Sequence, residues 1–551
     1  MANSLNIAVR LTEAARAWPD VAAVVVAGRR RRYRETSFAE LESLSNRLAS
    51  GLLELGVEPG HRIVLMVRPG LEFIAMVFAL FKTRAVVVLV DPGMGLRRVA
   101  ECLERTRPQG FVAVPAVQLA RLWWRRRFPD ARLNVTVGWP ALGGRAYRRL
   151  AGGSDRGFET VETAGDDPAA IIFTSGGTGP PKGVVYEHAM FGAQADWLRE
   201  FYEISPGEID LPGFPLFSLF NVAMGVTSVV PAIDPTRPAQ VDPRRIVDAI
   251  LDRSVTQAFG SPALWDRVGR YCRQHDVRLP SLKRVLSAGA PVPPAVIETM
   301  REALAVPQAD VHTPYGATEA LPVCSLDGAT ILAETAAESR GGAGTCVGRT
   351  FPGIELRIVE ITAGPIRSAD ELRDRPAGEI GEILVRGAVV TRRYNDQPGA
   401  TRQAKVPDPD GFWHRMGDVG YLDDSGRLWF CGRVAHVVRT ANGPLFSVRC
   451  EAIFNEHPRV ARSALVGLGN PPDQLPAMVV EPTPGNFPGG RDAGERLAGE
   501  LRELGRASPL TAAIERFAFH RSLPVDVRHN VKIDREALAR WAAGQSLIRR
   551  A

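Results

Sequence analysis

The segment TSGGTGPPKG, residues 174–183, directly follows the apolar run AAIIF, residues 169–173. The apolar run is typical of a buried strand, so we expect the glycine-rich segment to be a loop that projects from a sheet edge. Its glycines allow backbone amides to approach an anion closely. Three hydroxyls and one ammonium add further donors, on Thr174, Ser175, Thr178 and Lys182. The segment predicts a phosphate-binding loop rather than an exposed Gly/Pro turn.

This loop is not a Walker A motif, because Lys182 follows Pro181 instead of glycine, and Gly183 stands where Ser or Thr would bind magnesium. Lysine is scarce in the chain: only five residues are lysine, against 68 lysines and arginines together. Because arginine supplies most of the positive charge, we expect lysine at positions where a compact ammonium group on a flexible side chain is needed. Lys182 and Lys532 are the two candidates for such a role.

The composition indicates a globular protein of several packing units, with 551 residues, 45% hydrophobic and 23% charged. The net charge of +7 raises the question of nucleic-acid binding. The arginine clusters at residues 29–32 and 125–127 are short, separate and without a nucleic-acid-binding motif. A solvated surface is therefore the favoured interpretation, and no nucleic-acid partner is expected.

The six cysteines form no CxxC pair, and no histidine has a spacing suited to zinc. Reduced packing cysteines, and no signal-like N-terminal pattern, predict a cytoplasmic protein. The most apolar region, residues 73–90, contains Lys82 and Arg84, so it predicts a buried helix followed by a strand rather than a membrane span. The segment Leu122-Trp123-Trp124 beside residues 125–127 is compatible with a membrane or partner contact, although a capping segment on the fold is favoured.

Helical and β-branched segments alternate from about residue 38 to residue 300. Residues 39–55 and 72–81 have helical periodicity, and residues 63–67 and 85–90 are typical of strands. Such alternation predicts layered α/β subdomains with largely parallel sheets.

The pattern becomes strand-rich at about residues 340–433, where residues 354–359 and 379–385 predict a small antiparallel sheet or barrel. We therefore expect a large N-terminal domain over residues 1–433. Residues 434–551, which carry Lys532 and a predicted helix at 495–504, are expected to form a smaller α+β domain.

Several short motifs follow the loop, and each of them alone is weak evidence for any protein family. They are Ala288-Gly289-Ala290-Pro291, Tyr315-Gly316-Ala317-Thr318-Glu319, Gly417-Asp418, Gly432-Arg433 and Asn530-Val531-Lys532. Their order and spacing, together with the loop, resemble the adenylate-forming superfamily of acyl-CoA synthetases, luciferases and peptide-synthetase adenylation domains. The resemblance covers essentially the whole chain, from the helix at Phe38 to Arg535. It implies a large N-terminal domain followed by a smaller, mobile C-terminal lid.

The resemblance also implies a role for each motif residue. The loop would hold the β- and γ-phosphates of ATP, Tyr315 would stack on adenine, and Asp418 would bind the ribose hydroxyls. Glu319 would be the ligand of Mg²⁺ and would itself be a catalytic residue. Thr318 and Lys532 would be the other two catalytic residues, because both would contact the α-phosphate. The implied ATP-binding residues are Thr174, Ser175, Gly176, Gly177, Thr178, Gly179, Lys182, Gly289, Ala290, Tyr315, Gly316, Asp418 and Arg433.

Departures from the superfamily's usual pattern concern the second half-reaction. Ala435 occupies the hinge position that often holds Asp or Lys, and the loop at residues 440–444 lacks the usual glycine–glutamate signature. Ser218 stands where histidine is common, and Asn530-Val531 precedes Lys532 where Ser-Gly is common. These differences weaken the case for coenzyme A as the acceptor.

The same differences are similar to the β-lactone synthetase branch of bacterial olefin biosynthesis, with matching segments at residues 91–95, 176–182, 214–220 and 528–532. That resemblance implies ATP-dependent activation of a long-chain 2-alkyl-3-hydroxy fatty acid, followed by attack of its own hydroxyl to give a β-lactone. It also implies association with other olefin-pathway enzymes. The alternatives are a long-chain fatty acyl-CoA synthetase or acyl-AMP ligase, and a nucleotide-binding scaffold that has lost catalysis.

The acyl pocket is harder to read from the sequence. The resemblance suggests that Phe214, Phe217, Ser218 and Phe220 line it, but core packing explains this apolar segment equally well. No residue is identified as the base for the hydroxyl. His188 is a candidate, although a packing or hydrogen-bonding histidine is the favoured interpretation.

Overall fold

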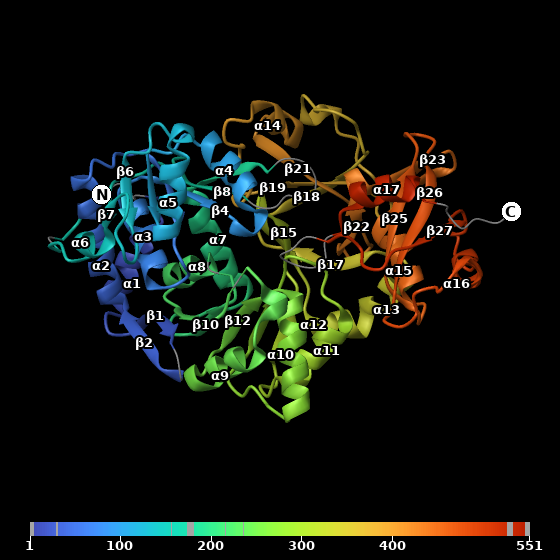
Figure 1. Cartoon of the computed structure of the whole chain (residues 1–551), viewed down its shortest axis with the longest axis horizontal. Helices are drawn as coiled ribbons and strands as arrows, with labels where there is room; N and C mark the ends of the chain where they lie inside the picture. Colours follow the sequence, from blue (N-terminus) through green and yellow to red (C-terminus); the bar gives the residue numbers. More distant parts are fainter. Residues whose placement is uncertain are drawn as a thin grey trace.

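The computed structural model describes residues 5–28, 31–155, 157–173, 181–214, 216–234, 236–525 and 533–545. Two largely parallel sheets and an antiparallel sheet are followed by a smaller C-terminal part, which lies at the opposite end of the molecule from the N-terminus (Figure 1). No helix among these residues is long and apolar enough to cross a membrane.

In the described part of the chain the first sheet has seven strands, and its edge strand β9 is antiparallel to the rest. Their spatial order is β7 (Arg145–Ala146), β6 (Leu133–Thr136), β5 (Gly110–Ala113), β3 (Arg62–Met66), β4 (Val86–Val90), β8 (Pro168–Phe173) and β9 (Gly183–Glu187). The buried strand predicted at residues 169–173 is confirmed as β8, so the glycine-rich segment connects β8 to β9.

The second sheet also has seven strands among the described residues, with β2 as its antiparallel edge. Their order is β14 (Asp310–His312), β13 (Arg284–Ser287), β12 (Gln257–Gly260), β10 (Ile209–Pro212), β11 (Thr227–Val230), β1 (Ala22–Ala27) and β2 (Tyr33–Ser37). Residues 289–291 of the motif Ala288-Gly289-Ala290-Pro291 follow the carboxyl end of β13 in a loop.

Helices fill the space between the two sheets. One core cluster joins Ile63 and Val87 of the first sheet to Val24 and Val230 of the second. The helices that contribute to this cluster from the two α/β layers are α1 (Val9–Ala17), α2 (Phe38–Glu54), α3 (Leu71–Lys82), α6 (Tyr147–Ala151), α7 (His188–Phe201) and α8 (Phe217–Ala223). The layered α/β architecture expected from the sequence is confirmed.

Other helices cover the outer faces of the sheets. On the first sheet these are α4 (Leu96–Arg105) and α5 (Pro115–Trp123), and on the second they are α9 (Pro243–Arg253), α10 (Pro262–His275) and α11 (Pro294–Ala303). Residues 73–90 behave as predicted. Helix α3 buries every residue except Glu72, and strand β4 follows it. Its Lys82 is fully buried and pairs with Glu42 at 2.7 Å.

The antiparallel sheet begins at Tyr315 and runs to Arg433. Its strands are β15 (Tyr315–Ala317), β16 (Ala320–Ser325), β17 (Thr345–Thr350), β22 (Leu428–Arg433), β21 (Gly411–Leu422), β19 (Gly381–Arg386) and β18 (Glu355–Val359), with β20 (Lys405–Asp408) paired to β21. The short helices α12 (Gly328–Thr330), α13 (Ala336–Arg340) and α14 (Pro398–Ala404) connect them. The sequence motifs at 315–319, 417–418 and 432–433 therefore all lie on this sheet.

The C-terminal part has its own core, which includes Phe454, Leu497 and Phe517. Its three-stranded sheet consists of β25 (Val460–Leu468), β26 (Leu475–Pro482) and β27 (Arg516–Phe519), beside the hairpin β23 (Val438–Thr440) and β24 (Gly443–Leu445). Its helices are α15 (Ser447–Asn455), α16 (Arg491–Arg506) and α17 (Arg535–Ala543). The predicted helix at residues 495–504 is confirmed within α16.

Candidate active site

A cavity of about 1990 Å³ lies where the second sheet, the antiparallel sheet and the C-terminal part meet. Most of the predicted site residues that the structure describes line it: Lys182, Gly289, Ala290, Tyr315, Gly316, Thr318, Glu319, Asp418 and Arg433. These residues are up to 251 positions apart in the chain (Lys182 to Arg433). The fold thus gathers the separate sequence motifs around one cavity.

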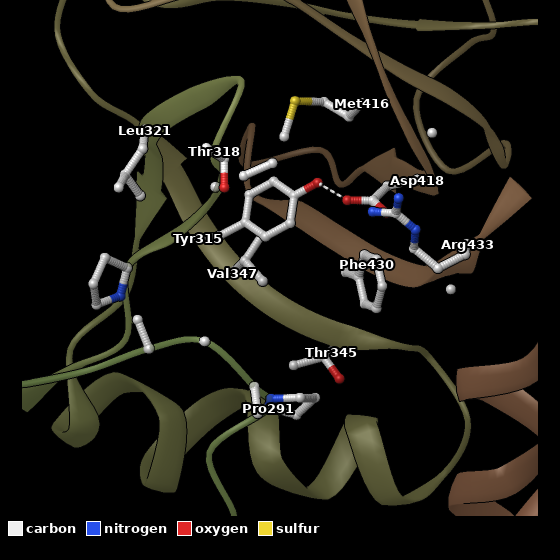
Figure 2. A pocket seen from close by; sticks show the side chains of 18 of the residues that line it. Pro291, Tyr315, Thr318, Leu321, Thr345, Val347, Met416, Asp418, Phe430 and Arg433 are labelled. Atoms are coloured by element: carbon white, nitrogen blue, oxygen red, sulfur yellow. Dashed lines mark hydrogen bonds and ion pairs between the residues drawn. The ribbon is translucent and has the colours of Figure 1, made fainter. Parts of the chain in front are cut away.

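Asp418 is the centre of a polar cluster at one end of the cavity. The Tyr315 hydroxyl donates to Asp418 Oδ2 at 2.6 Å, and Arg433 Nη1 donates to Oδ1 at 2.7 Å (Figure 2). Asp418 and Arg433 are register partners on β21 and β22, so strand pairing places the two side chains together. Burial, together with Asp418, raises the pKa of Tyr315 well above its usual value. The tyrosine therefore stays a neutral hydrogen-bond donor.

Two glycines shape the backbone around this cluster. Gly289 has φ +90°, a conformation that side-chain-bearing residues rarely adopt. A Cβ on Gly316 would stand 2.7 Å from the Ala320 carbonyl oxygen, across the β15–β16 hairpin. Both glycines line the cavity, at positions that do not readily accept a side chain, and their role in ATP binding stays a prediction.

Glu319 lies in a second polar cluster with Lys182. The Tyr394 hydroxyl donates to Glu319 Oε1 at 2.8 Å, and Lys182 Nζ lies 4.9 Å from the centroid of the same Tyr394 ring. The Glu319 carbonyl accepts from both the backbone amide and the hydroxyl of Thr391, at 2.9 and 3.1 Å. Tyr186 fixes the preceding residue by donating to the Thr318 carbonyl at 2.6 Å. Four long-range hydrogen bonds, from Tyr394, Thr391 and Tyr186, thus hold the Thr318-Glu319 segment.

Lys405 and His414 were not predicted as site residues. They are register partners on β20 and β21, and both are almost fully buried. Lys405 Nζ lies 3.5 Å from the Thr391 hydroxyl and 5.2 Å from the Phe412 ring centroid. Burial lowers the pKa of Lys405 to about 7, against the opposing influence of Glu319. Lys405 is one of only five lysines in the chain, but of these only Lys182 and Lys532 were given a role from the sequence.

His414 lines the cavity as a neutral imidazole. Burial and the nearby Lys405 lower the pKa of His414 well below its usual value. Its Nδ1 lies 3.2 Å from the Ala404 carbonyl oxygen, which fixes the orientation of the ring. Tyr394, Thr391 and Lys405 therefore form a support beneath Glu319, with His414 beside Lys405, that only the folded chain reveals.

Aromatic side chains form another part of the cavity wall. Phe214, Phe217 and Phe220 line it, and Phe217 stacks on Phe259 with ring centroids 4.0 Å apart. Ser218 is different: it is 2% exposed and lies on a separate small cavity beside Phe73 and Ile74. On helix α8 residues 217 and 220 share one face, so the intervening Ser218 is turned toward α3 instead. The structure does not bring Ser218 to the part of the cavity wall that Phe214, Phe217 and Phe220 form.

His188 does not lie on the cavity. It is fully buried against the Phe81 ring, and its Nδ1 accepts a hydrogen bond from the Ile7 amide at 3.4 Å. Burial lowers its pKa to about 4. His188 thus serves the core near the N-terminus, in agreement with the favoured interpretation of the sequence.

Several predicted residues lie outside the described part of the chain: Thr174, Ser175, Gly176, Gly177, Thr178, Gly179 and Lys532. Their assigned roles stay predictions. Ile533, Asp534 and Arg535, which follow Lys532 in the sequence, line the cavity from the C-terminal part. Arg535 is held there by an ion pair with Glu451 at 2.7 Å.

The fold and this cavity define an ATP-using enzyme that forms adenylates. A model of the family described as "AMP-binding enzyme" matches residues 11–395, and the chain belongs to this family. A solved amide bond synthetase, McbA from Marinactinospora thermotolerans, superposes with a TM-score of 0.78, 98% coverage of this chain and 99% of that one, at 23% identity.

Two curated relatives are more similar in sequence. The olefin beta-lactone synthetase of Xanthomonas campestris pv. campestris is 47% identical over 560 residues, which cover 99% of each chain. The olefin beta-lactone synthetase of Stenotrophomonas maltophilia is 44% identical over 556 residues, 98% of each. Both alignments therefore span the segments that depart from the usual superfamily pattern.

Proposed function

We propose that this enzyme activates a long-chain 2-alkyl-3-hydroxy fatty acid with ATP and then closes it to a β-lactone. In the first step a carboxylate oxygen attacks the α-phosphorus and pyrophosphate leaves. In the second the 3-hydroxyl oxygen attacks the acyl carbon, AMP leaves with the former carboxylate oxygen, and the hydroxyl proton is released. The observation that carries this proposal is full-length identity of 47% and 44% to two olefin β-lactone synthetases.

The Asp418 cluster is the proposed site for the nucleoside. Asp418 would bind the ribose hydroxyls, Arg433 would hold that carboxylate in place, and the Tyr315 ring would stack on adenine against Gly289 and Ala290. The distances that support this assignment are the 2.6 and 2.7 Å contacts to the two Asp418 oxygens. The loop from Thr174 through Gly179, with Lys182, would receive the β- and γ-phosphates.

Glu319 is the proposed ligand of Mg²⁺. Magnesium prefers one or two carboxylates together with phosphate oxygens and water, so the partly buried Glu319 carboxylate, beside the proposed phosphate loop, fits this ion. Among the described residues there is no group of three or more His, Cys, Asp or Glu that could hold a metal ion without such additional ligands. When bound, the ion would neutralise phosphate charge, and Thr318 and Lys532 would stabilise the negative charge that develops around the α-phosphorus.

Residues 434–551 are the proposed lid on a domain of residues 1–433. Ala435 lies in the short helical turn Val434–His436 between β22 and β23, where a change of backbone angles would rotate the lid. The cavity contacts of Asp534 and Arg535 support a role of the lid in the first step.

The second step needs no external thiol. The 3-hydroxyl, whose oxygen is three bonds from the activated carbonyl carbon, has a high effective molarity, which offsets part of the strain of a four-membered ring. An apolar wall of Phe214, Phe217 and Phe220 would hold the alkyl chains and exclude water from the acyl adenylate. A cytoplasmic location and association with other olefin-pathway enzymes belong to the same proposal.

One assay separates the proposed function from its rivals. The purified chain is incubated with ATP, Mg²⁺ and a racemic long-chain 2-alkyl-3-hydroxy acid, with and without coenzyme A. We expect β-lactone, AMP and pyrophosphate in both cases, and none of them from the Lys532→Ala variant. Thioester formed only with coenzyme A would establish an acyl-CoA synthetase instead. Absence of pyrophosphate release with any acid would favour a scaffold without catalysis.

A further inference from the structure

Helix α5 has an inverted distribution of polar and apolar side chains. Its Gln118 is fully buried and Arg121 is 8% exposed, whereas Trp123 is 86% exposed. Leu119 and Leu122 are also exposed, at 52% and 42%. Residues at spacings of three and four share a helix face, so these three apolar side chains form one outward face. Core packing does not explain this pattern, because the polar side of the helix is the buried one.

Hydrogen bonds fix the helix in this orientation. Gln118 Nε2 donates to the carbonyls of Phe111 and Val135, at 3.2 and 2.9 Å, on strands β5 and β6. Arg121 Nε donates to Gln118 Oε1 at 2.8 Å, and Arg121 Nη2 donates to the Gly143 carbonyl at 2.7 Å. Turning the helix to hide its apolar face would break these buried bonds, so the exposure of that face is built into the fold.

The loop at residues 138–143 extends the same surface. Gly138 lies against Pro115 at the start of α5, and Gly143 lies against Leu122 near its end. The loop therefore runs along the helix, and it exposes Trp139 and Leu142 by 80% and 38%. We call Leu119, Leu122, Trp123, Trp139 and Leu142 the indole face.

The capping role favoured for the segment at 122–124 holds for only one of its two tryptophans. Trp124 packs against the core cluster on the outer face of the first sheet, together with Phe128. The neighbouring Trp123 points away from that core and is almost completely exposed. Two indoles that are four-fifths or more exposed on one surface need another explanation.

Positive charge surrounds the indole face. Residues 115–149 contain eight arginines and one acidic residue, Asp130. Of these arginines all except Arg121 are exposed. The side chains of Arg125 and Arg126, which follow Trp124, form no hydrogen bond or ion pair with any residue that the structure describes, whereas Arg127 pairs with Glu104 at 3.2 Å. The surface is thus complementary to an extended layer of negative charge.

We propose that the indole face and its arginines bind the surface of an anionic lipid bilayer. Tryptophan rings settle at the headgroup level of membranes, and arginines near the surface are attracted by anionic headgroups. Leucine and tryptophan on one helix face, flanked by cationic residues, match the chemistry of interfacial anchoring. A protein partner would need an acidic surface as large as the indole face and its arginines. The charge pattern therefore favours a lipid bilayer as the binding partner.

This surface adjoins the helix that borders the active-site cavity. The Arg127–Glu104 ion pair joins the arginine turn after α5 to α4, and residues Arg98 and Glu101 of α4 line the cavity. In Figure 1, α4 and α5 lie in the blue-to-cyan region, away from the C-terminal part. Binding through the indole face would therefore bring the α4 side of the cavity near the lipid without engaging the proposed lid. The inference does not depend on the proposed reaction.

Vesicle co-sedimentation tests the proposal. The full chain is mixed with vesicles of phosphatidylcholine alone, or of phosphatidylcholine with about 30% phosphatidylglycerol, at low and high salt. We expect binding to the anionic vesicles that weakens as salt is added. The double variant Trp123→Ser/Trp139→Ser and the double variant Arg125→Gln/Arg126→Gln should each lower the partition coefficient by at least about tenfold.

The matched control removes one exposed apolar residue and two exposed arginines from elsewhere, in the variant Leu475→Ser/Arg373→Gln/Arg491→Gln. It should bind as the unaltered chain does. Pyrophosphate release and thermal unfolding of all variants, measured without lipid, should stay unchanged and so exclude misfolding. Equal vesicle binding by every variant, or no binding of the unaltered chain, would overturn the proposal. Loss of self-association in the tryptophan variant, without vesicle binding, would assign the face to a second copy of the chain.

Discussion

The two walls of the active-site cavity are built in different ways. The proposed nucleotide wall, around Asp418 and Glu319, consists of polar side chains held by directional contacts of 2.6 to 2.8 Å. The proposed acyl wall, formed by Phe214, Phe217 and Phe220, consists of aromatic rings held by packing, such as Phe217 on Phe259. Directional bonds demand particular residue types, whereas packing accepts many apolar ones. We therefore expect single substitutions to damage the first wall severely, whereas the second wall should tolerate other apolar residues.

The largest loss of activity should come from the nucleotide wall at Glu319. The Glu319→Gln variant keeps an oxygen to accept from Tyr394 but removes the charge proposed to bind Mg²⁺. We expect pyrophosphate release to fall by about a thousandfold, since removal of one electrostatic contact to a transition state has effects of this order. A loss smaller than about threefold at saturating Mg²⁺ would remove Glu319 from the proposed metal site.

Asp418 should give the next largest effect. Asp418→Asn removes the charge that pairs with Arg433 and weakens the proposed grip on the ribose. We expect kcat/KM for ATP to fall by about a hundredfold, mainly through KM. Tyr315→Phe is the matched control, because it removes only the hydroxyl that donates to Asp418 and keeps the ring proposed to stack on adenine. A similar fall of kcat/KM in both variants would show that ATP use depends on the Tyr315 hydroxyl rather than on the Asp418 charge.

The acyl wall should respond with a change of selectivity rather than a loss of chemistry. Phe217→Ala enlarges the cavity beside Phe259. We expect the preference between 2-alkyl-3-hydroxy acids of different chain length to change by about tenfold, while pyrophosphate release with the best acid stays within a few-fold. Competition between two acids, followed by mass spectrometry of the products, measures this ratio. An unchanged ratio would place the alkyl chains elsewhere.

The smallest effect concerns the support beneath Glu319. Because the pKa of Lys405 is lowered to about 7 in the folded chain, the unfolded chain binds more protons between about pH 7 and the usual lysine value. Stability should therefore rise with pH in this window, by at most about 1.4 kcal/mol per pH unit. Urea unfolding of the chain and of Lys405→Met between pH 7 and 9 tests this. Parallel pH profiles would show that Lys405 does not titrate there.

Much of the fold could be predicted because it depends on local patterns. The alternation of helices and strands identified the layered α/β part, and the continuous apolar run at 73–90 identified α3 and β4. The motif residues Tyr315, Asp418 and Arg433 were also identified, because their residue types and order are restricted. The direction of one side chain could not be predicted. Ser218 lies between Phe217 and Phe220 in the sequence, yet it faces a different cavity.

The supporting residues could not be predicted for a different reason. Tyr394 and Thr391 contact Glu319 across more than 70 positions of sequence, and no short motif records such a contact. Lys405 was noticed as one of five lysines, but its burial beside Thr391 depends on the pairing of β20 with β21. The outward direction of Trp123 likewise depends on the buried hydrogen bonds of Gln118.

The sequence by itself determined the succession of elements, the phosphate-loop composition at 174–183 and the residue types of the nucleotide wall, since these follow from local backbone freedom, periodicity and charge. The tertiary structure alone decided which side chains meet. Strand register joined Asp418 to Arg433 and Lys405 to His414, and helix orientation separated Phe217 from Ser218. Contacts between distant segments depend on the packing of whole sheets and helices, and local sequence does not specify them.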